Sequence, residues 1–204
     1  MLQNTIKISA GCVFVVLVIY FLIPSSYEIR NATPAGETIV CFGDSLTHGT
    51  GAEKGMDYPS QLSGLIGMKV VNTGVPGDTT ATALTRMEDI IEMNPRVVLI
   101  TLGGNDLKNR VQKEIAFKNL ELIIHTIQDH GALVILGGID VPFWGRGFGD
   151  AYKELSKETG SVLIPNILKD IMGKSDLMSD SIHPNSAGYT IMAERFYEAL
   201  KPYL

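Results

Sequence analysis

The sequence has little cysteine and no excess of basic residues. Two cysteines among 204 residues, Cys12 and Cys41, cannot form a disulfide framework, and both lie in apolar runs, which predicts unpaired thiols. No histidines and cysteines are spaced as zinc ligands, so we expect no metal site. The 17 Lys and Arg residues are scattered along the chain and are outnumbered by 22 Asp and Glu. This charge pattern indicates no nucleic-acid partner.

Charge is absent from one long stretch near the N-terminus. No charged residue occurs from Ile8 to Ile23, a run slightly shorter than the ~20 apolar residues of a typical membrane-spanning helix. Apolar side chains would cover all sides of such a helix, which disfavours a half-buried helix of the core. A cleaved signal peptide would end at a small-residue cleavage site, and no clear A-x-A pattern follows the run. An uncleaved signal anchor therefore fits better than a cleaved signal peptide.

These features divide the chain into three parts. Residues 1–24 are expected to form an N-terminal hydrophobic helix that contacts the membrane, residues 25–36 a polar linker, and residues 37–204 a single folded domain. The chain is 45% hydrophobic and 19% charged, which suits one domain with a full core. Lys7 favours a cytoplasmic N-terminus and a domain outside the cytoplasm, and cleavage would release it as a secreted or periplasmic protein. The sequence carries no signal for an oligomeric state.

Short apolar runs alternate with amphipathic ones through the domain. The apolar runs predict strands, each apolar on both faces as in a parallel sheet covered on both sides, at residues 38–42, 69–72, 97–102, 133–136 and 162–164. Helical spacing of apolar residues predicts helices at residues 58–66, 80–93, 113–130, 150–159 and 187–200. The alternation predicts an α/β fold with a doubly wound, mainly parallel five-stranded sheet.

Polar motifs follow the predicted strands, at the edge where ligands bind in such sheets. Ser45 comes directly after the first strand on a glycine-preceded turn, which can expose a nucleophile. Asp180 and His183 lie three residues apart, and Pro184 excludes helical geometry at His183. A tight turn would place the Asp180 carboxylate against one ring nitrogen of His183 and leave the other for Ser45. This arrangement predicts a Ser–His–Asp triad.

A catalytic serine also needs hydrogen-bond donors for the oxyanion that forms on the substrate. The candidates are the backbone N–H of Ser45, the side-chain amide of Asn105 and the N–H of a glycine within residues 72–79. Each motif is common by itself. Taken alone, Asp180 is more simply interpreted as a cap of a helix or turn, and His183 as a surface histidine. The occurrence of a motif after each of several strands favours catalysis.

Four separated blocks together resemble the SGNH (GDSL) hydrolase superfamily, especially its small bacterial arylesterases, acyl-CoA thioesterases and lysophospholipases. The blocks are Gly43-Asp44-Ser45-Leu46, Gly77-Asp78-Thr79, Gly103-Gly104-Asn105-Asp106 and Asp180-Ser181-Ile182-His183-Pro184-Asn185. The resemblance implies that Ser45, Asp180 and His183 are catalytic. It also implies an oxyanion hole of Ser45, Gly77 and Asn105, with Gly77 preferred over Gly74. The implied fold is a flavodoxin-like three-layer α/β/α sandwich without a metal or organic cofactor.

Residues 139–148 resemble the loop that borders the acyl-binding groove in this branch. Val141, Pro142, Phe143 and Trp144 are therefore expected to contact substrate, together with Asp44 beside the nucleophile. The alternative for Phe143 and Trp144 is packing on the core. Asp140 stands where relatives often carry a basic residue, which disfavours anionic head groups.

The combined features predict a serine esterase that cleaves acyl esters or thioesters through an acyl-Ser45 intermediate. The first alternative is a carbohydrate O-deacetylase or acyltransferase that acts on envelope polysaccharide with the same triad. The second alternative is a non-catalytic binding module on the same fold. The joint presence of Ser45, Asn105, Asp180 and His183 argues against that module, since a retired site has no physical need for all four.

Overall fold

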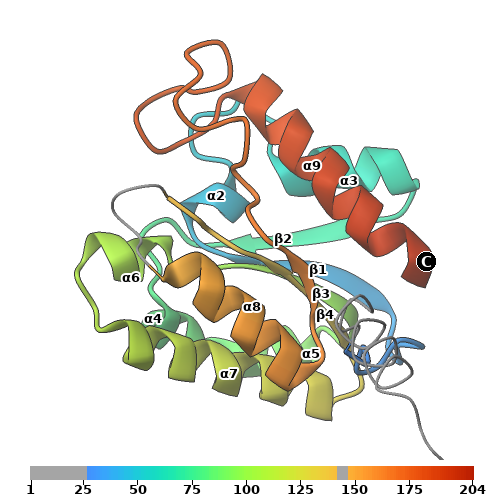
Figure 1. Ribbon diagram of the computed structural model, residues 1–204. Coiled ribbons are helices and arrows are strands. Elements are labelled where there is room, and N and C mark those ends of the chain that lie inside the picture. The colour runs from blue at the N-terminus through green and yellow to red at the C-terminus, as the bar shows by residue number, and fades with distance from the viewer. Residues whose placement is uncertain (1–26, 142–146) are drawn as a thin grey trace, which may run out of the picture.

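Five parallel strands form the centre of the molecule (Figure 1). The computed structural model describes residues 27–141 and 147–204. The strands are β1 (Thr38–Gly43), β2 (Val70–Gly74), β3 (Pro95–Thr101), β4 (Leu133–Gly137) and β5 (Val162–Ile164). They are arranged in the order β2-β1-β3-β4-β5, with each neighbouring pair parallel. This is the flavodoxin-like order, in which ligands bind at the carboxyl ends of β1 and β3, where the strand order reverses.

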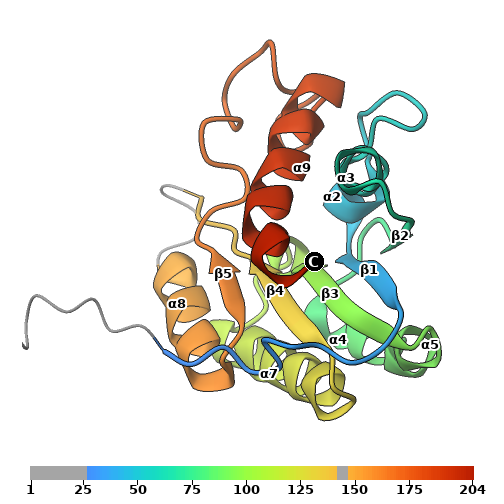
Figure 2. The ribbon, with the colours of Figure 1, turned by 90° about the vertical axis from the view of Figure 1, so that its right-hand side faces the viewer.

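Helices cover both faces of the sheet (Figure 2). One face carries α2 (Ser45–His48), α3 (Tyr58–Ile66) and α9 (Ser186–Leu200), with a short 3-10 helix, Lys201–Tyr203, after α9. The other face carries α4 (Thr80–Leu84), α5 (Met87–Glu92), α7 (Lys113–Asp129) and α8 (Phe148–Thr159), and α6 (Gly104–Lys108) packs beside α7. The prediction of an α/β fold with a five-stranded parallel sheet between helices is confirmed.

The inner strands are buried along their length because helices cover them on both sides. Every residue of β4 is buried, and β3 is buried from Val97 to Thr101. Aromatic side chains pack between the two helices α3 and α9 on one face of the sheet. Tyr58 of α3 stacks on Phe196 of α9 with ring centroids 4.8 Å apart. Both side chains are fully buried, so α3 and α9 are held together over the carboxyl half of the sheet.

Three expectations about helices differ from the structure. The predicted helix at residues 80–93 is two helices, α4 and α5, because the backbone leaves the helical path at Arg86, with φ −107° and ψ 11°. In the predicted helix at residues 113–130, helical spacing of the apolar residues would place Ile115 on the buried face of α7, but Ile115 is half exposed and Ala116 is buried instead. The helices α2 and α6 were not predicted, because four or five residues are too few to show helical periodicity.

The N-terminal segment is described from Tyr27 onward, so the predicted hydrophobic helix at residues 1–24 lies outside the described residues. The following stretch, predicted as a linker, is hydrogen-bonded to the domain. The Tyr27 hydroxyl donates to Ser161 O at 2.7 Å, and the Asn31 amide donates to Gln128 O at 2.8 Å and Ala132 O at 2.9 Å. Within residues 27–141 and 147–204, no helix has the length and apolar character needed to cross a membrane.

Candidate active site

Ser45 is the first residue of α2, directly after the carboxyl end of β1. The side chain of Asp44 caps α2, because its Oδ1 accepts the N–H of Leu46 at 2.9 Å. Gly43 is needed at the end of β1, since a Cβ at this position would lie 2.2 Å from Thr47 Oγ1 and 2.4 Å from Thr101 O. This close contact between β1, α2 and β3 fixes where the half-buried Ser45 side chain lies.

The loop before α9 brings His183 and Asp180 to Ser45. His183 Nε2 lies 3.1 Å from Ser45 Oγ, although the two residues are 138 positions apart in the sequence. On the other side of the ring, His183 Nδ1 lies 2.7 Å from Asp180 Oδ2. The three side chains predicted to form the triad therefore stand in line at hydrogen-bonding distances.

The Asp180 carboxylate is fixed by the turn that it begins. Its Oδ1 accepts the backbone N–H groups of Ile182 and His183, each at 2.8 Å. The hydrogen bond with the His183 ring, followed by these two backbone bonds, lowers the pKa of Asp180 to about 2. An ionised acceptor at Nδ1 selects the tautomer with its proton on that nitrogen. The lone pair of Nε2 then points to the Ser45 hydroxyl.

Gly77 lies in a tight turn after β2. The N–H of Asp78 donates to Val75 O at 3.1 Å, Pro76 is the second residue of the turn, and Gly77 has φ +89°. Proline followed by a residue with positive φ is the arrangement of a type II turn. No acceptor for the Gly77 N–H occurs in the part of the chain that the structure describes.

Gly74, the other glycine considered for the oxyanion hole, has a different role. Its N–H is engaged by Asn72 Oδ1 at 2.9 Å. Its Cα lies against α2, so that a Cβ would come within 2.1 Å of His48 N. Of the two glycines, Gly77 is therefore the one whose N–H is available to a ligand.

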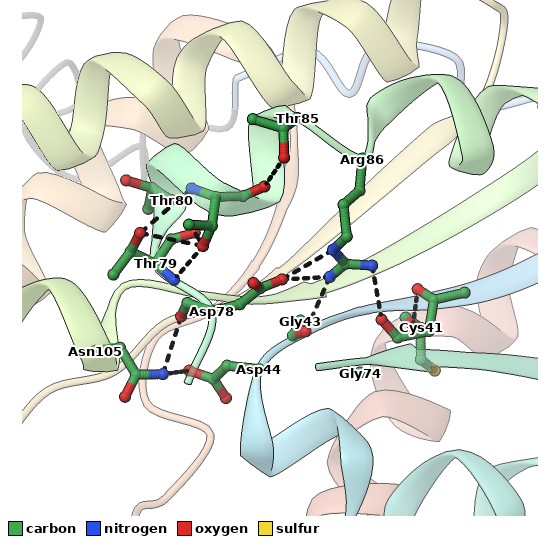
Figure 3. A network of polar contacts seen from close by, with 12 residues as sticks. Cys41, Gly43, Asp44, Gly74, Asp78, Thr79, Thr80, Thr85, Arg86 and Asn105 are labelled. Carbon is green, nitrogen blue, oxygen red and sulfur yellow. Dashed lines mark hydrogen bonds and ion pairs between the residues drawn. The ribbon is translucent and has the colours of Figure 1, made fainter. Parts of the chain in front are cut away.

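Asn105, the second residue of α6, lies between two loops (Figure 3). Its Nδ2 donates to Asp78 O at 2.9 Å and to Asp44 Oδ2 at 3.2 Å. Both N–H groups of the amide are thus engaged. Asn105 can donate to an oxyanion only by releasing or sharing one bond, and the bond to Asp44 is the longer of the two.

Asp44 was expected to contact substrate, and the structure gives it another position. Its side chain is buried, with 2% of the residue exposed, and both carboxyl oxygens are engaged, by Leu46 N–H and by Asn105. Burial raises the pKa of Asp44 to about 7, although the bond from Leu46 opposes the shift. Through these two hydrogen bonds, Asp44 orients the turn that carries Ser45 and the side-chain amide of Asn105.

A cluster of three buried hydroxyl groups supports the nucleophile turn and was not predicted. Tyr58 Oη lies 2.9 Å from Thr47 Oγ1 and 3.3 Å from Thr101 Oγ1. All three residues are fully buried, and they join α3, α2 and β3. Sequence patterns identify Tyr58 only as the start of a helix, because its partners are 11 and 43 residues away.

The remaining predicted substrate contacts are only partly described. Val141 is half-buried at the end of the segment after β4, and Pro142, Phe143 and Trp144 lie outside the described residues. His48, which follows Ser45 by three residues, is exposed. Among residues 27–141 and 147–204, no group of three or more His, Cys, Asp or Glu side chains could hold a metal ion.

The comparisons with known proteins identify relatives over most of the chain. Residues 41–191 match the GDSL-like Lipase/Acylhydrolase family. An arylesterase from Vibrio mimicus is 29% identical over 188 residues, which cover 86% of this chain and 94% of that protein. Thioesterase 1/protease 1/lysophospholipase L1 from Escherichia coli (strain K12) is 30% identical over 177 residues, which cover 82% of this chain and 85% of that protein.

A solved structure shows the same architecture. The crystal structure of TesA matches with a TM-score of 0.78 at 28% sequence identity, covering 82% of this chain and 100% of that one. The region that matches the family includes the turn of Ser45 and the loop of Asp180 and His183. The chain therefore belongs to the GDSL-like lipase/acylhydrolase family, the SGNH (GDSL) hydrolases.

Proposed function

We propose that this protein is a serine esterase that hydrolyses acyl esters or thioesters through an acyl-Ser45 intermediate. The observation that carries the proposal is the 3.1 Å separation of Ser45 Oγ and His183 Nε2, with Asp180 Oδ2 2.7 Å from the opposite ring nitrogen. The family and the relatives named as an arylesterase and a thioesterase support ester and thioester chemistry.

In the first half of the reaction, Ser45 Oγ attacks the acyl carbon while His183 Nε2 takes the hydroxyl proton. The carboxylate of Asp180 stabilises the imidazolium that results. When the tetrahedral intermediate collapses, the bond from the acyl carbon to the alcohol or thiol breaks. His183 returns its proton to that leaving group, and the acyl group remains on Ser45.

In the second half, a water molecule attacks the acyl carbon and gives its proton to His183. The ester bond to Ser45 then breaks, the carboxylic acid leaves, and the proton returns to Ser45 Oγ. The oxyanion of both halves is stabilised by the N–H groups of Ser45 and Gly77 and by the amide of Asn105. Loss of one such donor costs roughly 10²–10³ in kcat.

Substitution Ser45→Ala in the full-length protein tests the proposal. Turnover of p-nitrophenyl acyl esters and labelling by a fluorophosphonate are both expected to disappear, because no hydroxyl remains to form the acyl or phosphonyl bond. Ser63→Ala is a matched control, because the Ser63 hydroxyl only donates to Met68 O within its own segment. Full turnover by Ser45→Ala would remove Ser45 from the mechanism.

A panel of p-nitrophenyl esters and thioesters of graded acyl length defines the substrate class. Rates that rise with acyl length are expected for lipid-like substrates. A maximum at acetate would favour the carbohydrate O-deacetylase. A wild-type protein that neither turns over esters nor reacts with a fluorophosphonate would favour the binding module.

A further inference from the structure

Arg86 lies in the break between α4 and α5, and its side chain contacts the ends of β1 and β2 and the loop after β2 (Figure 3). Its Nε donates to Asp78 Oδ2 at 2.9 Å, and its Nη2 donates to the same oxygen. Its Nη1 donates to Thr73 O at 3.2 Å, and Nη2 also approaches Gly43 O at 3.5 Å. The guanidinium lies over the ring of Phe42, with Cζ 4.9 Å from the ring centroid.

The partners of Arg86 belong to the segments that carry the oxyanion donors of the proposed esterase. Gly43 is two residues before Ser45, and Asp78 directly follows Gly77. Asp78 O in turn accepts the amide of Asn105 at 2.9 Å. One guanidinium therefore contacts the end of β1 and the loop after β2 directly, and it is linked through Asp78 to Asn105 after β3.

We propose that Arg86 is a positioning residue of the oxyanion hole, which sets the spacing between the donors of Ser45, Gly77 and Asn105. The inference rests on the proposed esterase function. An oxyanion is stabilised only when its donors lie about 2.7–3.1 Å from the position where the charge develops. A small displacement of the Gly77 turn relative to Ser45 therefore lowers the rate of the chemical step more than it weakens substrate binding.

The contacts require arginine rather than any cation. A guanidinium presents five N–H donors in a rigid plane, whereas the ammonium of lysine is a compact charge on a flexible chain. Lysine could neutralise Asp78, but it could not hold that carboxylate and the carbonyls of Thr73 and Gly43 in one fixed geometry. The substitution Arg86→Lys therefore separates geometry from charge.

Arg195 offers a matched control for loss of stability. Its side chain is 23% exposed, compared with 22% for Arg86. Like Arg86, it donates to a backbone carbonyl, Ile167 O at 2.8 Å, and lies beside a carboxylate, that of Asp170 at 4.0 Å. It belongs to α9, and its hydrogen bond and ion pair are with Ile167 and Asp170, away from the segments that carry Ser45, Gly77 and Asn105. Arg195→Lys therefore reproduces the chemical change away from the oxyanion hole.

The test compares Arg86→Lys and Arg195→Lys with the wild-type full-length protein, using p-nitrophenyl butyrate. For Arg86→Lys we expect kcat per folded molecule to fall roughly 10- to 100-fold, with KM within about 2-fold of the wild-type value. Arg195→Lys is expected to keep the wild-type kcat. The folded fraction is measured by near-UV circular dichroism, so that partial unfolding is not counted as a loss of catalysis.

A second variant supplies a chemical rescue. Arg86→Ala leaves a partly exposed space beside Asp78, which added methylguanidinium can enter. We expect a saturable recovery of kcat with methylguanidinium and none with tetramethylammonium at equal ionic strength. If Arg86→Ala does not fold, Arg86→Lys decides the question alone.

Two results would overturn the inference in distinguishable ways. A wild-type kcat in Arg86→Lys, with wild-type turnover that depends on Ser45, would overturn the role of Arg86 and leave the esterase proposal intact. Absence of ester turnover by the wild-type protein would overturn both.

Discussion

Asp44 and Asp180 are two carboxyl groups near Ser45 with opposite shifts in pKa. Asp180 is half exposed and accepts three hydrogen bonds, which favour its charged form and lower its pKa to about 2. Asp44 is almost fully buried, and the loss of hydration raises its pKa to about 7. The same functional group is therefore a permanent anion in one position and a group that titrates near neutral pH in the other.

The shift at Asp44 predicts how Asp44→Asn changes stability with pH. The pKa in the unfolded chain is about 3.9, so the wild-type folded state retains a proton between pH 4 and 7 that the unfolded state releases. The free energy of unfolding of the wild type therefore falls as pH rises through this range, and asparagine removes that penalty. We expect the stability of Asp44→Asn relative to wild type to increase by roughly 3–4 kcal/mol from pH 4 to pH 8.

Urea denaturation at the two pH values measures this difference. Asp150→Asn is the control for the chemical change, because the side chain of Asp150 is 78% exposed and keeps most of its hydration in the folded protein. A stability difference for Asp44→Asn that does not vary with pH would show that Asp44 ionises normally in the folded protein.

At the scale of secondary structure elements, the nucleophile depends on the junction between β1 and α2. Gly43 lies where β1, α2 and β3 approach most closely, and Asp44 and Gly49 limit α2 to four residues. Gly49 adopts φ +90° and its N–H donates to Ser45 O, which ends the helix. The position of Ser45 is therefore fixed by the close packing at Gly43 and by the two ends of this short helix.

Gly43→Ala is expected to destabilise the protein by about 1–3 kcal/mol and to lower kcat/KM, because the new methyl group would overlap Thr101 O, a backbone atom of β3. Gly64→Ala in α3 is the control. A Cβ at Gly64 meets nothing within 4 Å, so this change should stabilise the helix by about 0.5–1 kcal/mol. Urea denaturation and ester turnover measure both effects. Equal behaviour of the two variants would contradict the steric argument.

At the scale of the whole molecule, residues 27–37 run along the domain at the end of the sheet opposite Ser45. Arg30 N–H donates to Gly160 O, and Ala35 N–H donates to Gly131 O, so the segment joins the ends of α7 and α8. Asn31 has φ +57° and donates to two carbonyl groups at and after the end of α7. This segment therefore contributes to the stability of the domain that follows it.

Asn31→Ala tests that contribution. The loss of two hydrogen bonds, together with a left-handed backbone that alanine disfavours, is expected to cost about 1–3 kcal/mol of the free energy of unfolding. Asn31→Gly loses the same bonds without the backbone strain, so it should be less destabilising than Asn31→Ala. Denaturant unfolding of the full-length variants gives both values. Wild-type stability in both would show that the segment is not held by Asn31.

The sequence determined most of the fold and the identity of the candidate site residues. A strand buried on both faces is a continuous apolar run, and a long helix repeats its apolar residues, so the strands and α3, α7, α8 and α9 could be located from local patterns. Ser45, Asp180 and His183 could be named because each motif is also local.

Only the tertiary structure decided how these parts combine. The contact of Ser45 with His183, that of Asp44 with Asn105, and those of Arg86 with Thr73 and Gly43 join residues that are 13 to 138 positions apart in the sequence. Hydrogen-bond partners and loss of hydration depend on which segments the fold places together. Local propensity and spacing carry no information about those distances, because they act within a few residues.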